Sequence, residues 1–204
     1  MPDLRIAVFA SHTGTNLRAL HAASRNEGSG FSVGLVISNN SGSGALAFAR
    51  AQRIAAAHMS SRTHPDSDEL DDAMRTVLIE HGIGWVVTAG YMRKLGPRVR
   101  KEFVSRIINV HPALLPKFGG QGMYGQHVHE AVLASGDTVS GPTIHMVDAD
   151  YDTGETIAQL EVPVLPDDSA ETLGARVLAA EHTLLPATVT GLATGQRLYM
   201  HIQP

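Results

Sequence analysis

The sequence of 204 residues has no cysteine, and only 5% of its residues are aromatic. Without cysteine the chain can form no disulfide, no thiolate nucleophile and no zinc site built on sulfur. It also lacks a surplus of positive charge, because its formal net charge is -4. A protein that binds nucleic acid usually carries a basic surface, so we expect no nucleic-acid partner.

Long apolar runs are missing as well. No stretch approaches the roughly 18 apolar residues of a membrane-spanning helix, and the first apolar segment is too short for a signal peptide. We therefore expect a cytoplasmic protein with no membrane partner. The length and the 43% hydrophobic content suit a single globular domain over 1–204.

Short apolar runs alternate with amphipathic helical segments through the first half of the chain. The runs typical of buried strands cover 5–10, 31–37, 54–58, 85–89 and 106–109. This alternation predicts an α/β fold of three layers, with a doubly wound, mostly parallel sheet of about seven strands.

The second half of the chain departs from this alternation. Two further strand-like segments, 139–146 and 155–164, are separated by too few residues for a helical crossover. They predict one antiparallel pair in the C-terminal half. A final helix is expected from Ser169 to about Leu185, and a short strand is expected at 198–202.

A strand that ends in polar residues is the feature around which the chain is organised. Asn109 and His111 lie two residues apart and would face the same side of a strand, while Pro112 and Pro116 prevent the strand from continuing. A glycine-rich loop, 119–125, follows. Open α/β sheets place their active sites at such strand ends.

Further polar residues can join this strand end. His145 lies on the next predicted strand and Asp152 follows that strand. A histidine beside a carboxylate can hold its proton at neutral pH, and an amide and an imidazolium can stabilise an oxyanion. The chain has no cysteine and no obvious nucleophile-elbow serine, so we expect a substrate nucleophile to attack directly. The competing interpretation of His111 is a structural histidine.

The turn after the first strand is a candidate anion site. Gly14, Thr15 and Asn16 would present the free backbone N–H groups of a helix N-terminus to a phosphate monoester. The end of the second strand has no acidic residue, which argues against NAD. The competing interpretation is an ordinary turn between a strand and a helix.

Metal binding is the rival chemistry for the histidines. His111, His127, His129 and His145 are candidate ligands. However, His127 and His129 lie at the start of a predicted helix, where residues two apart do not face each other. The i, i+4 spacing of zinc proteases is missing, so we expect no metal.

The segment Asn109-Val110-His111-Pro112-Ala113-Leu114-Leu115-Pro116 is similar to the signature N-x-H-P-[SA]-L-L-P of formyltransferases that use 10-formyltetrahydrofolate. More narrowly, the chain resembles the phosphoribosylglycinamide formyltransferases. The matches follow in order along nearly the whole chain, at 11–17, 89–93, 109–118, 145, 152–154 and 181–182.

The resemblance implies roles for individual residues. Asn109, His111 and Asp152 would be catalytic, with His145 supporting the carboxylate. Gly14, Thr15 and Asn16 would hold the ribonucleotide phosphate, and Glu181 would contact the glycinamide amine; otherwise Glu181 reads as an exposed helical residue. The implied folate-binding residues are Met92, Arg93, Lys94, Leu95, Val147, Asp148, Ala149, Asp150 and Tyr151. The half 1–105 would then bind nucleotide, and 106–204 would bind folate and carry catalysis.

The implied reaction transfers the formyl group of 10-formyltetrahydrofolate, a co-substrate, to glycinamide ribonucleotide in purine synthesis. The implied partners are these small molecules, with the protein a monomer or a homodimer. Relatives that act on methionyl-tRNA carry an extra C-terminal domain, and formyltetrahydrofolate hydrolases carry an N-terminal one. The sequence 1–204 has no segment that reads as either, which favours transfer to the ribonucleotide. Transfer to a nucleotide sugar, hydrolysis and a non-catalytic folate-binding module stay open as alternatives.

Three features depart from the family pattern. His12 stands where glycine is usual, so the backbone of the phosphate turn is expected to differ. Lys94 stands where an aliphatic residue is common, which backbone contacts would tolerate. The loop 119–125 is longer than in compact members of the family and is a candidate lid.

Overall fold

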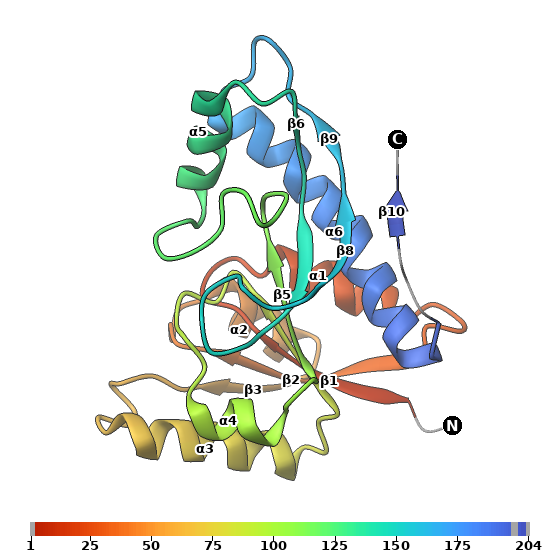
Figure 1. Ribbon diagram of the computed structural model, residues 1–204. Helices are drawn as coiled ribbons and strands as arrows, with labels where there is room; N and C mark the ends of the chain where they lie inside the picture. Colours follow the sequence, from red (N-terminus) through yellow and green to blue (C-terminus); the bar gives the residue numbers. More distant parts are fainter. Residues whose placement is uncertain (1–2, 197–199, 203–204) are drawn as a thin grey trace. The chain divides into compact units, whose positions relative to one another are not determined.

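The computed structural model describes residues 3–196 and 200–202 (Figure 1). These residues form two compact units, one ending at Ile108 and the other beginning at Asn109. The prediction of a single domain over 1–204 stays a prediction.

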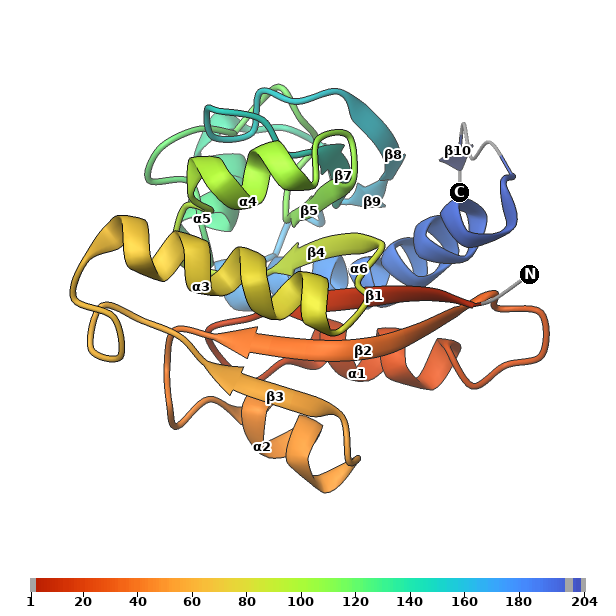
Figure 2. The ribbon, with the colours of Figure 1, turned by 90° about the horizontal axis from the view of Figure 1, so that it is seen from below.

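The first unit alternates strands and helices, as the sequence predicts. Its strands β1, β2, β3 and β4 run parallel in the order β4-β1-β2-β3. Helices α1 and α2 cover one face of these strands, and α3 and α4 cover the other (Figure 2). The elements are β1 (Leu4–Phe9), α1 (Thr15–Ala23), β2 (Phe31–Ser38), α2 (Gly44–Ala51), β3 (Ala55–His58), α3 (Ser67–Glu80), β4 (Trp85–Ala89) and α4 (Pro97–Glu102).

Strand β1 lies between β4 and β2 and is buried on both faces. Its residues 6–9 are fully buried, as the continuous apolar run predicts for a strand covered on both faces.

Two helices of this unit begin at side-chain N-caps. Ser43 accepts a hydrogen bond from the backbone of α2, and Asp66 accepts two from the backbone of α3. The doubly wound arrangement is therefore confirmed for this half of the chain.

Strand β5 (Ile107–His111) begins in the first unit and ends in the second. In the second unit the strand order is β5-β7-β8-β10, and β6 and β9 form a separate pair. The long helix α6 packs against α5, β7, β8 and β9 (Figure 1). The elements are α5 (Gln126–Ser135), β6 (Val139–Ser140), β7 (Thr143–Met146), β8 (Thr156–Leu160), β9 (Val162–Pro163), α6 (Ala170–Thr194) and β10 (Met200–Ile202).

The antiparallel pairing in the second unit is confirmed, but the prediction of two long, uninterrupted strands is wrong. The segment 139–146 is divided at Gly141 and Pro142 into β6 and β7, and 155–164 is divided at Glu161 into β8 and β9. Each part pairs with its counterpart, β7 with β8 and β6 with β9. A proline has no N–H for a central ladder, so the pairing changes sheets at this point.

The predicted end of the last helix at Leu185 is also wrong, because α6 continues through Pro186 to Thr194. Proline inside a helix removes one backbone hydrogen bond. Here the buried side chains Leu184, Leu185 and Val189 hold both sides of the interruption in the core. The strand expected at 198–202 is present as β10, while its first two positions lie outside the described residues. No helix in the described parts of the chain is both long and apolar enough to cross a membrane.

Candidate active site and phosphate-binding turn

His111 is the last residue of β5, and Pro112 follows it. The imidazole is buried, and its Nε2 lies 2.9 Å from the carbonyl oxygen of Phe118, to which it donates. The other ring nitrogen, Nδ1, lies 3.5 Å from Oδ2 of Asp152. The strand end therefore places one histidine between a backbone acceptor and a carboxylate.

His145 approaches the same carboxylate from β7. Its Nδ1 donates to the Met146 carbonyl at 2.8 Å, and its Nε2 lies 3.4 Å from Oδ1 of Asp152. The amide nitrogen of Asn109 lies 3.1 Å from that Nε2. A register shift between Ile144 and His145 in the pairing with β8 is the kind of bulge that re-aims a side chain beside an active site.

Asp152 joins the two histidines and is held by the backbone. Its Oδ2 accepts a hydrogen bond from the Gly120 N–H at 2.9 Å, and its side chain is 10% exposed. Its backbone has φ 57°, a left-handed conformation that aspartate tolerates better than most residues. We call Asn109, His111, His145 and Asp152 the polar cluster.

Burial and charge act in opposite directions on this cluster. Burial lowers the pKa of His111, and the charge of Asp152 and the bond to Phe118 raise it by less, so the pKa lies below its usual range. Burial raises the pKa of Asp152, but His145, His111 and Gly120 together outweigh it, so this carboxyl stays ionised at lower pH than usual. The lowered pKa of His111 disfavours a proton on this ring at neutral pH in the free protein, whereas the sequence pattern favoured one.

The tautomers follow from the backbone acceptors. Each imidazole donates one N–H to a carbonyl, so the nitrogen facing Asp152 gains a proton only when that ring becomes an imidazolium. Asp152 would stabilise this charge on either ring. The cluster can thus accept one proton from a reacting group and hold an amide donor beside it.

The phosphate turn predicted in the first unit has the backbone that an anion site requires. Gly14 immediately precedes α1 with φ 72° and ψ 38°, a left-handed conformation that suits glycine. A Cβ on Gly14 would lie 2.9 Å from the Cα of Ala45, so no larger residue fits. Thr15 and Asn16 form the first turn of α1, whose N–H groups have no helical acceptor.

Ser11 ties this turn to the end of β4. The Ser11 hydroxyl donates to Oδ1 of Asn39 at 2.5 Å and accepts from the Met92 N–H at 2.8 Å. The Ser11 N–H donates to the Gly90 carbonyl at 3.0 Å. Strand β1 lies between β2 and β4 in the sheet, so the strands that follow β1 in sequence lie on both sides of it. Ligands of open α/β sheets bind at such a switch point.

A family model described as formyl transferase matches residues 4–189 of this sequence. The chain belongs to the formyl transferase family. The fold class predicted from the sequence, mostly parallel with one antiparallel pair, is thereby confirmed.

Relatives of this chain include the chloroplastic phosphoribosylglycinamide formyltransferase of Arabidopsis thaliana, 40% identical over 88% of the chain and 62% of the relative. The relative from Vigna unguiculata is 41% identical over 92% of the chain and 60% of its own length. The chain thus spans about three fifths of these curated relatives. Among solved structures, glycinamide ribonucleotide transformylase 1 from Symbiobacterium toebii has a TM-score of 0.88 and 36% identity, covering 95% of this chain and 89% of that one.

The other site residues predicted from the sequence occupy varied environments. Arg93, Lys94 and Met92 are exposed after β4, whereas Leu95 is buried. Met92 is therefore not a core residue. Glu181 is only 7% exposed on α6, so the alternative of an exposed glutamate is wrong.

The loop 147–151 is largely exposed. Oδ1 of Asp148 accepts hydrogen bonds from the Asp150 N–H and the Thr153 hydroxyl, which shapes the loop just before Asp152. The structure thus places the predicted folate residues Val147, Ala149 and Tyr151 on the same short segment.

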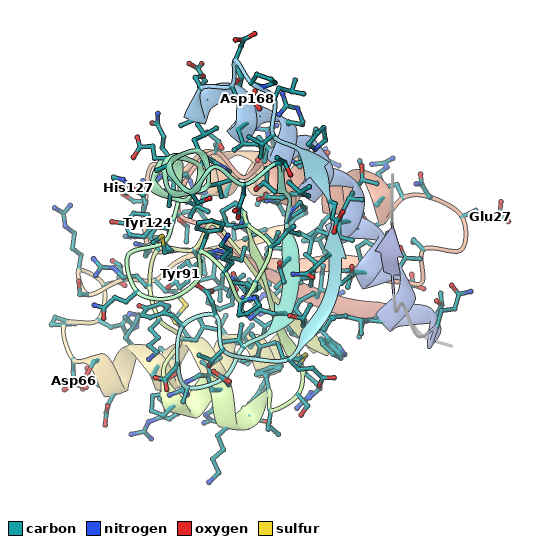
Figure 3. All side chains as sticks on the ribbon, turned by 45° about the horizontal axis from the view of Figure 1, so that its top comes forward. Glu27, Asp66, Tyr91, Tyr124, His127 and Asp168 are labelled. Atoms are coloured by element: carbon teal, nitrogen blue, oxygen red, sulfur yellow. The ribbon has the colours of Figure 1, made fainter. Side chains whose placement is uncertain are left out.

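The histidines of α5 lie in contrasting environments. His127 is exposed, pairs with Glu130 and contacts the ring of Tyr124 edge-on (Figure 3). His129 is buried, and burial followed by the charge of His111 lowers its pKa. Within the described residues, no group of three or more histidine, aspartate or glutamate side chains has the arrangement to hold a metal ion.

Sequence reasoning missed the backbone partners of the cluster. The Phe118 carbonyl comes from the residue before the glycine-rich loop, and the Gly120 N–H comes from the start of that loop. Phe118 has φ 59°, and its side chain packs against the apolar core of the second unit. A sequence pattern identifies side chains, so it held no signal for these main-chain contacts.

Proposed function

We propose that the chain transfers the formyl group of 10-formyltetrahydrofolate to the amine of glycinamide ribonucleotide, giving the formylated ribonucleotide and tetrahydrofolate. One observation supports this most strongly. The imidazoles of His111 and His145 flank the carboxylate of Asp152, and the amide of Asn109 contacts the ring of His145, in a chain of the formyl transferase family. These groups suit an addition that creates an oxyanion and releases a proton.

The reaction begins when the amine lone pair attacks the formyl carbon. The carbonyl π electrons move to oxygen, and the amide of Asn109 donates to the resulting oxyanion. The proton lost by the amine moves to the imidazole nitrogen of His111 that faces Asp152. The imidazolium then lies beside the oxyanion and stabilises it.

Collapse of the tetrahedral adduct completes the transfer. The carbonyl re-forms, the bond between the formyl carbon and the folate nitrogen breaks, and its electron pair leaves with that nitrogen. The proton held by His111 passes to the leaving nitrogen. The cluster returns to its starting charge, and His145 holds Asp152 and Asn109 in place throughout.

Ligand binding follows from the same proposal. The turn at Gly14, Thr15 and Asn16 would bind the ribonucleotide phosphate through backbone N–H groups, and Glu181 would contact the glycinamide amine. The segments 92–95 and 147–151 would contact the folate. The cytoplasmic location and the oligomeric state stay predictions.

A formyl-transfer assay tests this function. Purified protein is mixed with 10-formyltetrahydrofolate and glycinamide ribonucleotide, with a parallel sample that lacks the amine, and both folate and nucleotide products are measured. We expect folate conversion only when the amine is present, with one formylated nucleotide formed per folate. Conversion without amine would indicate a hydrolase, and folate binding without conversion would indicate a binding module; either would contradict the proposal. Conversion of a nucleotide-sugar amine alone would reassign the acceptor.

A further inference from the structure

The three residues Ala113, Leu114 and Leu115 connect the catalytic strand to the glycine-rich loop. They lie between Pro112 and Pro116, where the β ladder has ended. Ala113 is fully buried and Leu115 is 9% exposed. Their backbone polar groups still require partners, because a buried N–H or C=O without one is destabilising.

Thr143, the first residue of β7, supplies those partners with one hydroxyl. It donates to the Ala113 carbonyl at 2.7 Å and accepts from the Leu115 N–H at 3.0 Å. It also accepts from Nε2 of Gln159 at 2.9 Å. A hydroxyl has one donor and two acceptor sites, so all three are used, and the Thr143 side chain is fully buried.

Gln159 completes the arrangement from the neighbouring strand. It lies opposite Thr143 in the pairing of β7 with β8. Its Nε2 also donates to the Leu115 carbonyl at 2.9 Å. Both amide hydrogens of Gln159 are thus used to hold one short segment and the hydroxyl that braces it.

We propose that Thr143 and Gln159 are positioning residues for formyl transfer. They fasten the segment that follows His111 to β7, the strand that also carries His145. The two histidines that face Asp152 are thereby fixed relative to each other by this brace as well as by the β ladder. This inference rests on the proposed function and assigns these two residues a role in it.

The chemistry explains why the brace matters for rate. Replacing the hydroxyl by a methyl group leaves a buried carbonyl and a buried N–H unpaired, so the segment has to move toward other partners. Misplacement of a reacting group by about 1 Å can cost about a hundredfold in rate. The segments proposed to contact ligands, 14–16, 92–95 and 147–151, take no part in these hydrogen bonds, so we expect KM to change less than kcat.

Three variants test the brace: Thr143→Val, which keeps the shape, Thr143→Ser, which keeps the hydroxyl, and Gln159→Met, which removes both amide donors. Thr138→Val, at an exposed position before β6, is the matched control. We expect Thr143→Val and Gln159→Met to lower kcat at least about tenfold with KM within about threefold. Thr143→Ser and the control should stay within about threefold of the wild type in both parameters.

Amide hydrogen exchange of Leu115 supplies a readout that does not depend on activity. Exchange should be faster in Thr143→Val than in the wild type and unchanged in the control. If Thr143→Val does not fold, Gln159→Met carries the comparison through kcat. Wild-type kcat in folded Thr143→Val or Gln159→Met, or unchanged Leu115 exchange in Thr143→Val, would overturn the positioning role. Failure of the wild-type chain to transfer formyl groups would instead overturn the proposed function.

Discussion

The two candidate sites of this chain use different chemical groups: main-chain donors in one and ionisable side chains in the other. The turn in the first unit uses small residues and main-chain groups, with Gly14 left-handed and the Ser11 hydroxyl bridging two strand ends. The polar cluster in the second unit uses buried ionisable side chains around Asp152. Main-chain donors keep their charge distribution at every pH, whereas imidazoles change theirs when they bind a proton. A donor whose charge does not depend on pH suits phosphate binding, and a side chain that gains and loses a proton suits proton transfer.

Removing an imidazole from the cluster should have the largest effect on the reaction. For His111→Ala we expect kcat to fall by about a hundredfold or more, because the variant loses both the proton acceptor and the oxyanion stabiliser. His64→Ala, in the loop before α3 of the first unit, is the control and should retain wild-type kcat. A fall of less than about tenfold, equal to about 1.4 kcal/mol of barrier, would mean that the cluster does not carry the chemistry.

Adding one methyl group to the turn should instead damage binding and stability. Gly14→Ala meets a left-handed backbone, which costs about 1–2 kcal/mol, and a contact with Ala45 that adds about 1–3 kcal/mol by overpacking. We expect a higher KM for the ribonucleotide and a lower unfolding free energy in urea.

Gly28→Ala separates these two costs. Gly28 has φ 78°, but no atom lies within 4 Å of its added Cβ. This variant should lose only the backbone contribution and keep its KM. Equal losses in both variants would show that the close approach to α2 is unimportant.

The Ser11 bridge allows a smaller test of the first unit. Ser11→Ala leaves the Met92 N–H and Oδ1 of Asn39 without this partner, and we expect a loss of about 1–2 kcal/mol in the unfolding free energy. Ser61→Ala, at an exposed position, should change it by less than about 0.5 kcal/mol. A neutral Ser11→Ala would show that the two strand ends hold their positions without the hydroxyl.

The fold of the first unit was predictable because its signals are local. Each apolar run and each helical pattern lies within one stretch of sequence, and alternation alone implies a parallel sheet. In the second unit the division at Gly141 and Pro142 depends on which strand each part pairs with. Likewise, α6 passes Pro186 because buried neighbours compensate for the lost bond, which no local rule captures.

The candidate site was predictable only in part for the same reason. The spacing of Asn109 and His111 and the resemblance to the family identified the residues of the cluster. The direction of the pKa shift of His111 did not follow from the sequence, because burial outweighs the neighbouring carboxylate there. Thr143 and Gln159 lie 16 positions apart and meet only across the β7–β8 pair, so their shared role required the three-dimensional contacts.

The smallest predicted effect is a pH dependence of the unfolding free energy that comes from three buried or half-buried histidines. The pKa values of His111, His129 and His182 lie below the ordinary 6.5, with burial as the main cause. Below about pH 6.5 the unfolded chain binds more protons than the folded one, so the unfolding free energy falls as the pH is lowered. Each histidine contributes at most about 1.4 kcal/mol per pH unit.

Urea unfolding of the wild type and of His111→Gln between pH 5 and 7 measures this slope. The variant should show the shallower decline, since it lacks one of the three groups. The Asp152 carboxyl does not contribute in this range, because its pKa lies below 3.8 and its stabilisation is lost only at lower pH. An unchanged slope would show that His111 is as accessible to protons in the folded chain as in the unfolded one.

The central claim is that the turn at Gly14 binds the ribonucleotide while the polar cluster carries out the transfer. The variant Asp152→Asn tests this claim most directly. Ribonucleotide affinity is measured by calorimetry and formyl transfer by single-turnover kinetics at saturating concentrations of both substrates, with Asp167→Asn, on an exposed loop, as the control. We predict that Asp152→Asn binds the ribonucleotide with the wild-type Kd while its transfer rate falls by about a hundredfold or more. A wild-type transfer rate in this variant would contradict the account, because the carboxylate that joins the two histidines would then be dispensable.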